Sequence, residues 1–189
     1  MGVFEYVSVL TSIVIGLGIA HLLRGVASLI QHPGRHKAYR VHLFWVAFMF
    51  FQAIFWWWWE FGLETLETWT FQVYLFVLLY AFILYLLCAL LFPSDLDGYA
   101  GYEDYFLSRR VWFFGLLATF FLVDFGDTWL KGPDYFASLG LEYLISQGLY
   151  ILFCIGAMIT KHRRFHAGFA AIALVYQISW AFRSYSTIG

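Results

Sequence analysis

The chain has 189 residues, of which 62% are hydrophobic, 23% aromatic and only 12% charged, and its mean hydropathy is +0.74. Soluble domains contain about 45–50% apolar and about 25% charged residues, so this composition excludes an ordinary soluble domain. A formal net charge of −1 provides no field that would attract DNA or RNA, so we expect no nucleic acid as a partner.

Six apolar segments of about 20 residues are long enough to cross a hydrocarbon core of about 30 Å. They predict an all-α, polytopic transmembrane helical bundle that forms a single domain over residues 1–189, with the lipid bilayer as its surroundings. The expected spans cover residues 7–30, 41–59, 69–92, 111–130, 137–160 and 165–185. Pro33, Pro93 and Pro133 all fall between these spans, where a missing N–H ends a helix at little cost.

The first span lacks the basic region and cleavage site of a secretory signal, so we expect it to be a mature helix. Small residues follow two of its faces: Ser8, Ser12, Gly16 and Ala20 on one, and Thr11, Gly18 and Gly25 on the other. Small side chains let neighbouring helices approach closely, which predicts a position central to the bundle or at an oligomer interface. The alternative is a helix that lines a path and places His21 near mid-depth.

Tryptophans mark one membrane surface. Trp56, Trp57, Trp58 and Trp59 end the second span directly before Glu60, and Trp69 opens the third. Indole rings are enriched at the level of the lipid headgroups, so these residues predict an interfacial belt.

The longest connection, residues 93–108, separates three spans from three. This layout is compatible with a 3+3 inverted repeat, the plan of many transporters. Tyr99, Tyr102, Tyr105 and Phe106 recur within the connection at helical spacing and predict a short segment lying on the membrane surface.

Nine of the eleven cations fall on one side of the expected bundle: Arg24, Arg35, Lys37, Arg40, Arg109, Arg110, Lys161, Arg163 and Arg164. The positive-inside rule places this side, with the connection 93–108, in the cytoplasm and both termini outside. The outer side collects the acids Glu5, Glu60, Glu64, Glu67, Asp127 and Asp134. The compact multi-pass design without eukaryotic targeting features indicates a bacterial inner membrane.

Polar residues at depth are the informative ones, because a charge at the bilayer centre costs about 2.5–3.5 kcal/mol and needs a partner or a function. The candidates for a pathway or for buried polar contacts are His21, Arg24, Gln52, Asp124, Asp127, Glu142, Gln147, Gln177 and Arg183. Amides can serve simply as links between helices, and Arg24 can extend to the headgroups without a partner. Arg183 is expected at the depth of Glu142 and Asp124, so either carboxylate could pair with it.

One polar stripe runs along the end of the fourth span and contains Asp124, Asp127, Thr128 and Lys131. It is either solvated or turned into the bundle. In the second case Glu5, Glu60 and Glu142 would join it in an acidic vestibule that concentrates cations.

The sequence gives weak signals for metals and none for cofactors. His162 and His166 are spaced by four and form a weak candidate metal pair, although a basic interfacial rim explains them as well. His21 has no second histidine at its depth for haem, and Cys88 and Cys154 lie in apolar spans where they indicate no redox compartment.

No catalytic residue is assigned, because the chain contains no G-x-S-x-G, H-E-x-x-H or glycine-rich phosphate loop. Three functions compete. The first is a small transporter or channel for a cation, proton or small solute, and its size favours a transporter or an oligomer with shared interfaces over a wide pore. The second is a non-catalytic membrane subunit or sensor that binds a cytoplasmic partner, or anionic lipid, through Arg35, Lys37, Arg40, Lys161, Arg163 and Arg164. The third is an intramembrane haem or metal redox protein.

Overall fold

The computed structural model describes residues 2–34, 37–66 and 68–184, so Arg35, His36 and Glu67 lie outside the described residues. Within them the chain is all-helical: α1 Val3–Gln31, α2 Arg40–Trp59, the 3₁₀ helix η1 Glu60–Thr65, α3 Phe71–Ala89, α4 Tyr102–Leu130, α5 Pro133–Ser138, α6 Gly140–Ile159 and α7 Arg163–Ser184. Six candidate spans are long and apolar enough to cross a membrane, with α2 and η1 counted as one. The prediction of an all-α, multi-pass bundle is confirmed.

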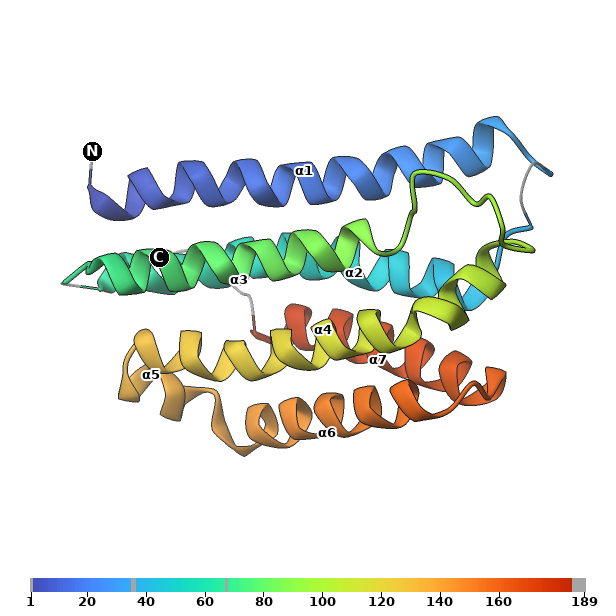
Figure 1. Ribbon diagram of the computed structural model, residues 1–189. Coiled ribbons are helices and arrows are strands. Elements are labelled where there is room, and N and C mark those ends of the chain that lie inside the picture. Colours follow the sequence, from blue (N-terminus) through green and yellow to red (C-terminus); the bar gives the residue numbers. More distant parts are fainter. Residues whose placement is uncertain (1, 35–36, 67, 185–189) are drawn as a thin grey trace.

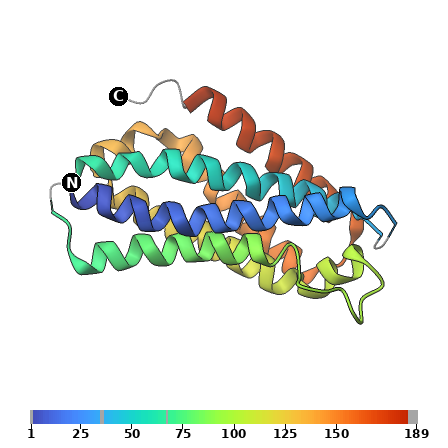
Figure 2. The ribbon, with the colours of Figure 1, turned by 90° about the horizontal axis from the view of Figure 1, so that it is seen from above.

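The helices form a flattened bundle with α1 and α6 on opposite sides (Figure 1). Between them lie α2 beside α3, and α4 beside α7 (Figures 1 and 2). The closest packing joins α1 to α3, α4 to α6, and α2 to α7. Helix α7 runs obliquely to α2, and its C-terminal end diverges from it (Figure 2).

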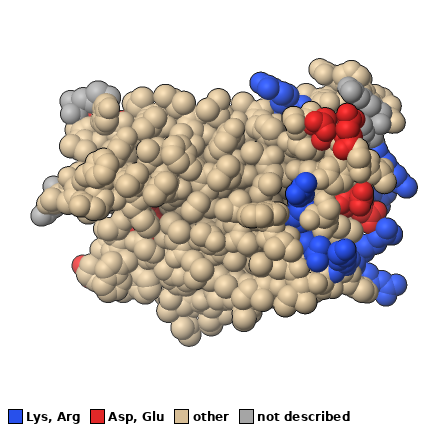
Figure 3. Space-filling model, in the orientation of Figure 1, with Lys and Arg blue, Asp and Glu red and all other residues tan. Residues whose placement is uncertain are grey.

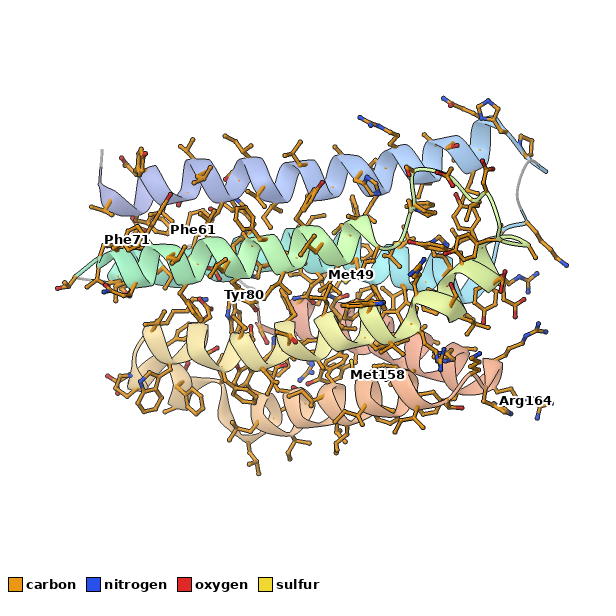
Figure 4. The ribbon with its side chains drawn as sticks, viewed as in Figure 1. Met49, Phe61, Phe71, Tyr80, Met158 and Arg164 are labelled. Carbon is orange, nitrogen blue, oxygen red and sulfur yellow. The ribbon has the colours of Figure 1, made fainter. Side chains whose placement is uncertain are left out.

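The two ends of the bundle differ in composition. Lys and Arg side chains gather at the end where α1 finishes and α7 begins, hereafter the basic end (Figure 3). Arg164 lies there, whereas Phe61 and Phe71 lie at the opposite end (Figure 4). We call this opposite end the tryptophan end, because the four consecutive tryptophans of α2 shortly precede Phe61 and Trp69 shortly precedes Phe71. The sorting of charges expected from the sequence is therefore visible in the fold, whereas the 3+3 repeat stays a prediction.

Helix α4 begins at Tyr102, earlier than the expected span at 111, and includes most of the segment expected on the membrane surface. Glu103 and Asp104 lie in its first turn, where carboxylates interact favourably with the helix dipole. Gly101, with φ at +145°, adopts a backbone conformation that other residues rarely take. Tyr102, Tyr105 and Phe106 are buried in the core, so the prediction of a surface-lying segment was wrong.

The fifth expected span, 137–160, is divided into α5 and α6. Gly140 has a φ of +68°, which turns the chain between the two helices. Pro133 occupies the first position of α5, where its fixed φ suits a helix start. The short α5 therefore lies over the tryptophan end, and only α6 crosses the bundle.

Aromatic rings fill the middle of the bundle towards the basic end. The fully buried Trp45 of α2 meets Phe113 and Phe114 of α4 and Phe169 of α7 edge to face, at centroid distances of 4.9–5.5 Å. Edge-to-face pairs of this kind contribute about 0.5–1.5 kcal/mol each beyond area burial. Inside a bilayer such packing, rather than water exclusion, holds helices together.

Helix α1 packs through one of its two small-residue faces. A Cβ atom on Gly18 would lie 3.4 Å from Cys88 of α3, and one on Gly25 would lie 2.2 Å from the Phe92 ring. On the other face Gly16 is open, since nothing lies within 4 Å of a Cβ placed on it. Helix α1 is thus peripheral, so the expectation of a central helix was wrong, and the oligomer interface stays a prediction.

We expect Gly25→Ala to lower the free energy of unfolding in detergent by about 1–3 kcal/mol, because the buried Phe92 ring must move. Gly16→Ala is the matched control on the same helix and should be neutral or slightly stabilising, since alanine favours helix. Thermal unfolding midpoints of the purified variants test this difference. Equal losses in both variants would contradict the close packing of α1 on α3.

Candidate functional site

The carboxylate of Asp124 is buried in the bundle and accepts three hydrogen bonds from side chains. It accepts hydrogen bonds from the Tyr80 hydroxyl at 2.8 Å, the Tyr143 hydroxyl at 2.7 Å and the Gln147 amide at 2.5 Å. Thr128 in turn donates to the Tyr143 oxygen at 2.9 Å. Asp124 is 7% exposed, and Tyr80 lies on the side of α3 that faces α4 (Figure 4). These bonds join α3, α4 and α6 at one point.

A pocket of about 90 Å³ opens beside Asp124, and we call it the Asp124 pocket. Four of the polar candidates expected from the sequence line it together: Gln52, Asp124, Gln147 and Gln177, from α2, α4, α6 and α7. The side chains of Gln52 and Gln177 are hydrogen-bonded to each other at 2.5 Å. The buried Oε1 of Gln147 has no hydrogen-bond partner among the described residues. A residue of the pocket lining therefore carries an unpartnered acceptor next to a carboxylate.

The remaining lining of the Asp124 pocket is mostly aromatic. It consists of Phe55, Trp56, Trp59, Phe121, Tyr143, Ser146, Tyr150, Tyr176 and Trp180. Among the described residues this lining includes no lysine, arginine or histidine. Faces of tryptophan and tyrosine rings attract cations, and a carboxylate does so more strongly. The chemistry of the pocket therefore favours a small group with a positive charge or with hydrogen-bond donors.

Lys131 lies in a second buried group, which we call the Lys131 cluster. Its ammonium group pairs with Asp127 one turn earlier in the chain and with Glu60 of η1 at 3.3 Å, and the lysine side chain is fully buried. It also sits over the Trp59 ring at 5.1 Å and the Tyr135 ring at 5.9 Å. The polar stripe of the fourth span is therefore turned into the bundle rather than solvated.

Together the two buried groups contain three carboxyl groups, Asp124, Asp127 and Glu60, and one ammonium group. Fully ionised, they would leave an excess of negative charge where each unpaired ion costs several kcal/mol. Trp59 links the two groups, since it stacks on Tyr143 and contacts the ammonium group of Lys131. The interior of the tryptophan end thus contains two more carboxyl groups than ammonium groups.

Glu142 and Arg183 form an ion pair between α6 and α7, with Nη2 and Oε1 2.6 Å apart. Both side chains are about half exposed, and Tyr176 also donates to Glu142 at 3.2 Å. Of the two carboxylates expected at this depth, Glu142 therefore pairs with Arg183, while Asp124 is held by tyrosines. Because Tyr176 lines the Asp124 pocket, the ion pair lies close to its rim.

The prediction that these acids form one acidic vestibule was wrong. Glu60 and Asp127 belong to the Lys131 cluster, Glu142 pairs with Arg183, and Glu5 accepts from the backbone N–H of Gly2 at 2.9 Å. Lys131 and Arg183 hold acids at separate places, because ion pairs in a membrane cost less free energy than one unpaired group of like charges.

The four consecutive tryptophans do not form one belt. Successive residues of a helix point in different directions, about 100° apart. Trp56 is buried against Tyr80, with ring centroids 5.5 Å apart, and Trp59 lines the Asp124 pocket. Trp57 is exposed at the surface and donates to Ser12 of α1 at 2.7 Å. Two of the five tryptophans of the expected belt, Trp56 and Trp59, therefore face the interior.

His21 is a structural residue of the basic end. Its Nε2 bonds the carbonyl of Phe92 at 2.8 Å, His42 bonds the carbonyl of Leu91 at 2.6 Å, and Tyr105 bonds that of Leu90 at 2.9 Å. These carbonyls follow the end of α3 and have lost their helical donors. Side chains from α1, α2 and α4 replace those donors and fix the three helices there.

The remaining candidates lie at the basic end and do not converge. Arg24, Lys37, Arg40, Lys161, Arg163 and Arg164 are all exposed, and Arg163 pairs with Glu103. His162 is exposed, whereas His166 is buried and bonds the Thr160 carbonyl at 2.9 Å, so the two do not form a pair. Within residues 2–34, 37–66 and 68–184, no three His, Cys, Asp or Glu side chains are placed to hold a metal ion.

Sequence reasoning missed the tyrosines that surround Asp124. Tyr80 lies in the middle of an apolar span that also contains Tyr74 and Tyr85. A hydroxyl at that depth needs a partner, and this requirement was the available signal. On α6, Tyr143, Gln147 and Tyr150 recur at intervals of four and three. That helical spacing places one hydroxyl-rich and amide-rich face towards a neighbour.

Comparison with family models, with curated proteins and with solved structures gives no match for this chain.

We expect Lys131→Met to lower the free energy of unfolding by about 3–5 kcal/mol, because it leaves Glu60 and Asp127 buried without a cation. Lys161→Met, which removes an exposed lysine, should change it by less than about 0.5 kcal/mol. Asp127→Asn added to Lys131→Met should recover part of the loss. A Lys131→Met protein that unfolds at the parent's temperature in detergent would contradict this account of the Lys131 cluster.

Proposed function

We propose that the chain is a small membrane transporter whose Asp124 pocket binds a small solute carrying a positive charge. The observation that carries the proposal is the convergence of Gln52, Asp124, Gln147 and Gln177 from four helices on one pocket. Gln177 bonds Gln52 and the Gln147 amide donates to Asp124, so two polar pairs from four helices border the same pocket. Links between helices account for the pairs themselves, whereas the pocket beside them and the unpartnered oxygen of Gln147 favour a ligand.

The charge of the solute follows from the surroundings of the pocket. Carboxyl groups outnumber the single buried ammonium group at this end, so a bound cation or proton would offset the excess charge. The rings of Trp56, Trp59 and Trp180 supply further sites for a cation. The volume of about 90 Å³ suits an ammonium-sized group better than a large organic molecule.

A transporter fits better than an open channel, because aromatic side chains fill the bundle between the pocket and the basic end. Phe48 contacts the pocket residue Tyr150 at a centroid distance of 6.1 Å, and Trp45 packs behind Phe48 at 5.3 Å. Passage would need these packed rings to move, as in alternating access. By the positive-inside rule we place the basic end in the cytoplasm of a bacterial inner membrane, the pocket in the outer half and both termini outside.

The test is flux in proteoliposomes, with protons, Na⁺ and methylammonium as the probes. We expect the parent to move at least one of them and Asp124→Asn to reduce that rate about tenfold or more, because the charge-bearing acceptor is lost. Asp134→Asn is the matched control, since it removes an exposed carboxylate of α5 at the same end and should leave the rate unchanged. No flux in the parent, or equal flux in parent and Asp124→Asn, would contradict the proposal.

A second candidate, a membrane subunit that anchors an acidic cytoplasmic protein, is favoured by the basic end. Its exposed cations form a surface that a partner could contact (Figure 3), and Lys161 and Arg164 are both exposed near the start of α7. Rim charges of this kind mainly set association rate and salt dependence.

For that candidate, we expect a stoichiometric partner to co-purify in mild detergent and to be lost on Lys161→Glu with Arg164→Glu. Asp134→Lys, a charge reversal at the tryptophan end, should retain it. Purification of the parent without any bound protein at low salt would count against an anchoring role.

A further inference from the structure

A second hollow adjoins the Asp124 pocket. It has a volume of about 140 Å³, lies between α6 and α7, and we call it the α6–α7 groove. Ser146, Tyr150 and Tyr176 line both the pocket and the groove, so the two share a wall. The rest of the groove is apolar and consists of Leu149, Phe153, Phe169, Ile172 and Ala173. A polar chamber and an apolar one therefore lie side by side, on the two sides of this wall.

Two tyrosine hydroxyls hold α6 and α7 together at the shared wall. Tyr150 of α6 donates to the Ala173 carbonyl of α7 at 3.2 Å, and Tyr176 of α7 donates to Glu142 of α6 at 3.2 Å. The two rings lie 6.2 Å apart. Helices α6 and α7 pack less closely than α4 and α6, so these bonds fix a separation that leaves room for the groove.

The groove borders the surface that faces lipid. Ile172 is 67% exposed, Leu149 47% and Phe153 41%, and all three belong to helices that span the membrane. An apolar chain already dissolved in the bilayer can therefore reach the groove without crossing water. The Asp124 pocket beside the groove offers a polar site for the head of such a molecule.

We propose that the ligand is a single-chain cationic amphiphile whose ammonium head occupies the Asp124 pocket and whose alkyl chain lies in the α6–α7 groove. This inference rests on the proposed function and specifies its substrate class. A methylene group is similar in volume to a water molecule in the liquid, about 30 Å³, so the groove holds about four or five methylene groups. One short alkyl chain fits this volume, so the proposal commits to an amphiphile with a single chain.

The experiment measures inhibition of methylammonium uptake by primary alkylammonium ions of one to eight carbons in proteoliposomes. Two groove variants are compared with the parent: Ala173→Leu, which fills the groove, and Phe153→Ala, which lengthens it. Val175→Leu introduces the same residue at an exposed position of the same helix and serves as the control. Partition of each inhibitor into lipid is the same for every variant, so differences between variants report the groove itself.

We expect Ala173→Leu to weaken inhibition by butylammonium and hexylammonium about fivefold or more while leaving methylammonium uptake unchanged, because only the chain loses its space. Phe153→Ala should shift the best inhibitor to a longer chain, and Val175→Leu should match the parent. If Ala173→Leu fails to fold, the inhibition profile of Phe153→Ala tests the inference by itself, since the exposed position of Phe153 tolerates truncation.

Equal inhibition profiles in the parent and in the folded groove variants would overturn the inference. Methylammonium uptake that Asp124→Asn abolishes would then leave the proposed function intact, with a purely polar solute as its substrate. Conversely, a parent that moves none of the probes and binds no alkylammonium ion would overturn both the proposed function and this inference.

Discussion

The need to satisfy Asp124 inside a bilayer constrains this structure more than any other single contact. Hydrocarbon offers no hydrogen bonds, so the carboxylate takes its donors from Tyr80, Tyr143 and Gln147. Those donors come from α3 and α6, so the same bonds hold α4 between its neighbours and fix the depth of all three helices. The Asp124 pocket exists because this framework keeps the carboxylate at the wall and α7 oblique beside it.

Polar groups are buried in different ways at the two ends of the bundle. At the tryptophan end, ions are buried in groups, with Lys131 held by Asp127 and Glu60. At the basic end, every described Lys and Arg except the partly buried Arg110 is exposed, and backbone carbonyls after α3 are satisfied by His21 and His42. The first arrangement leaves excess carboxyl groups near a pocket, whereas the second buries no Asp, Glu, Lys or Arg among the described residues. The proposed binding of a cationic head belongs to the end where buried carboxyl groups outnumber buried cations.

The pocket and the α6–α7 groove depend on how α7 is attached. It packs closely on α2 but only loosely on α6, where Tyr150, Tyr176 and the Glu142–Arg183 pair bridge the gap. Side-chain bridges of this kind can break and re-form more readily than a packed aromatic interface. An element with these properties suits the movement that the proposed transport requires, while α1 and α3 hold the opposite side of the bundle through close contacts at Gly18 and Gly25.

The sequence by itself determined that the chain is a six-span helical membrane protein with most of its cations at one end, because hydrocarbon thickness and charge cost act on each segment separately. It also marked Gln52, Asp124, Gln147 and Gln177 as residues that need an explanation. Only the tertiary structure decided that these four meet at one pocket, that Lys131 points inward and that His21 binds a carbonyl. The helix to which each polar face turns depends on the packing of all the others, and no local periodicity encodes it.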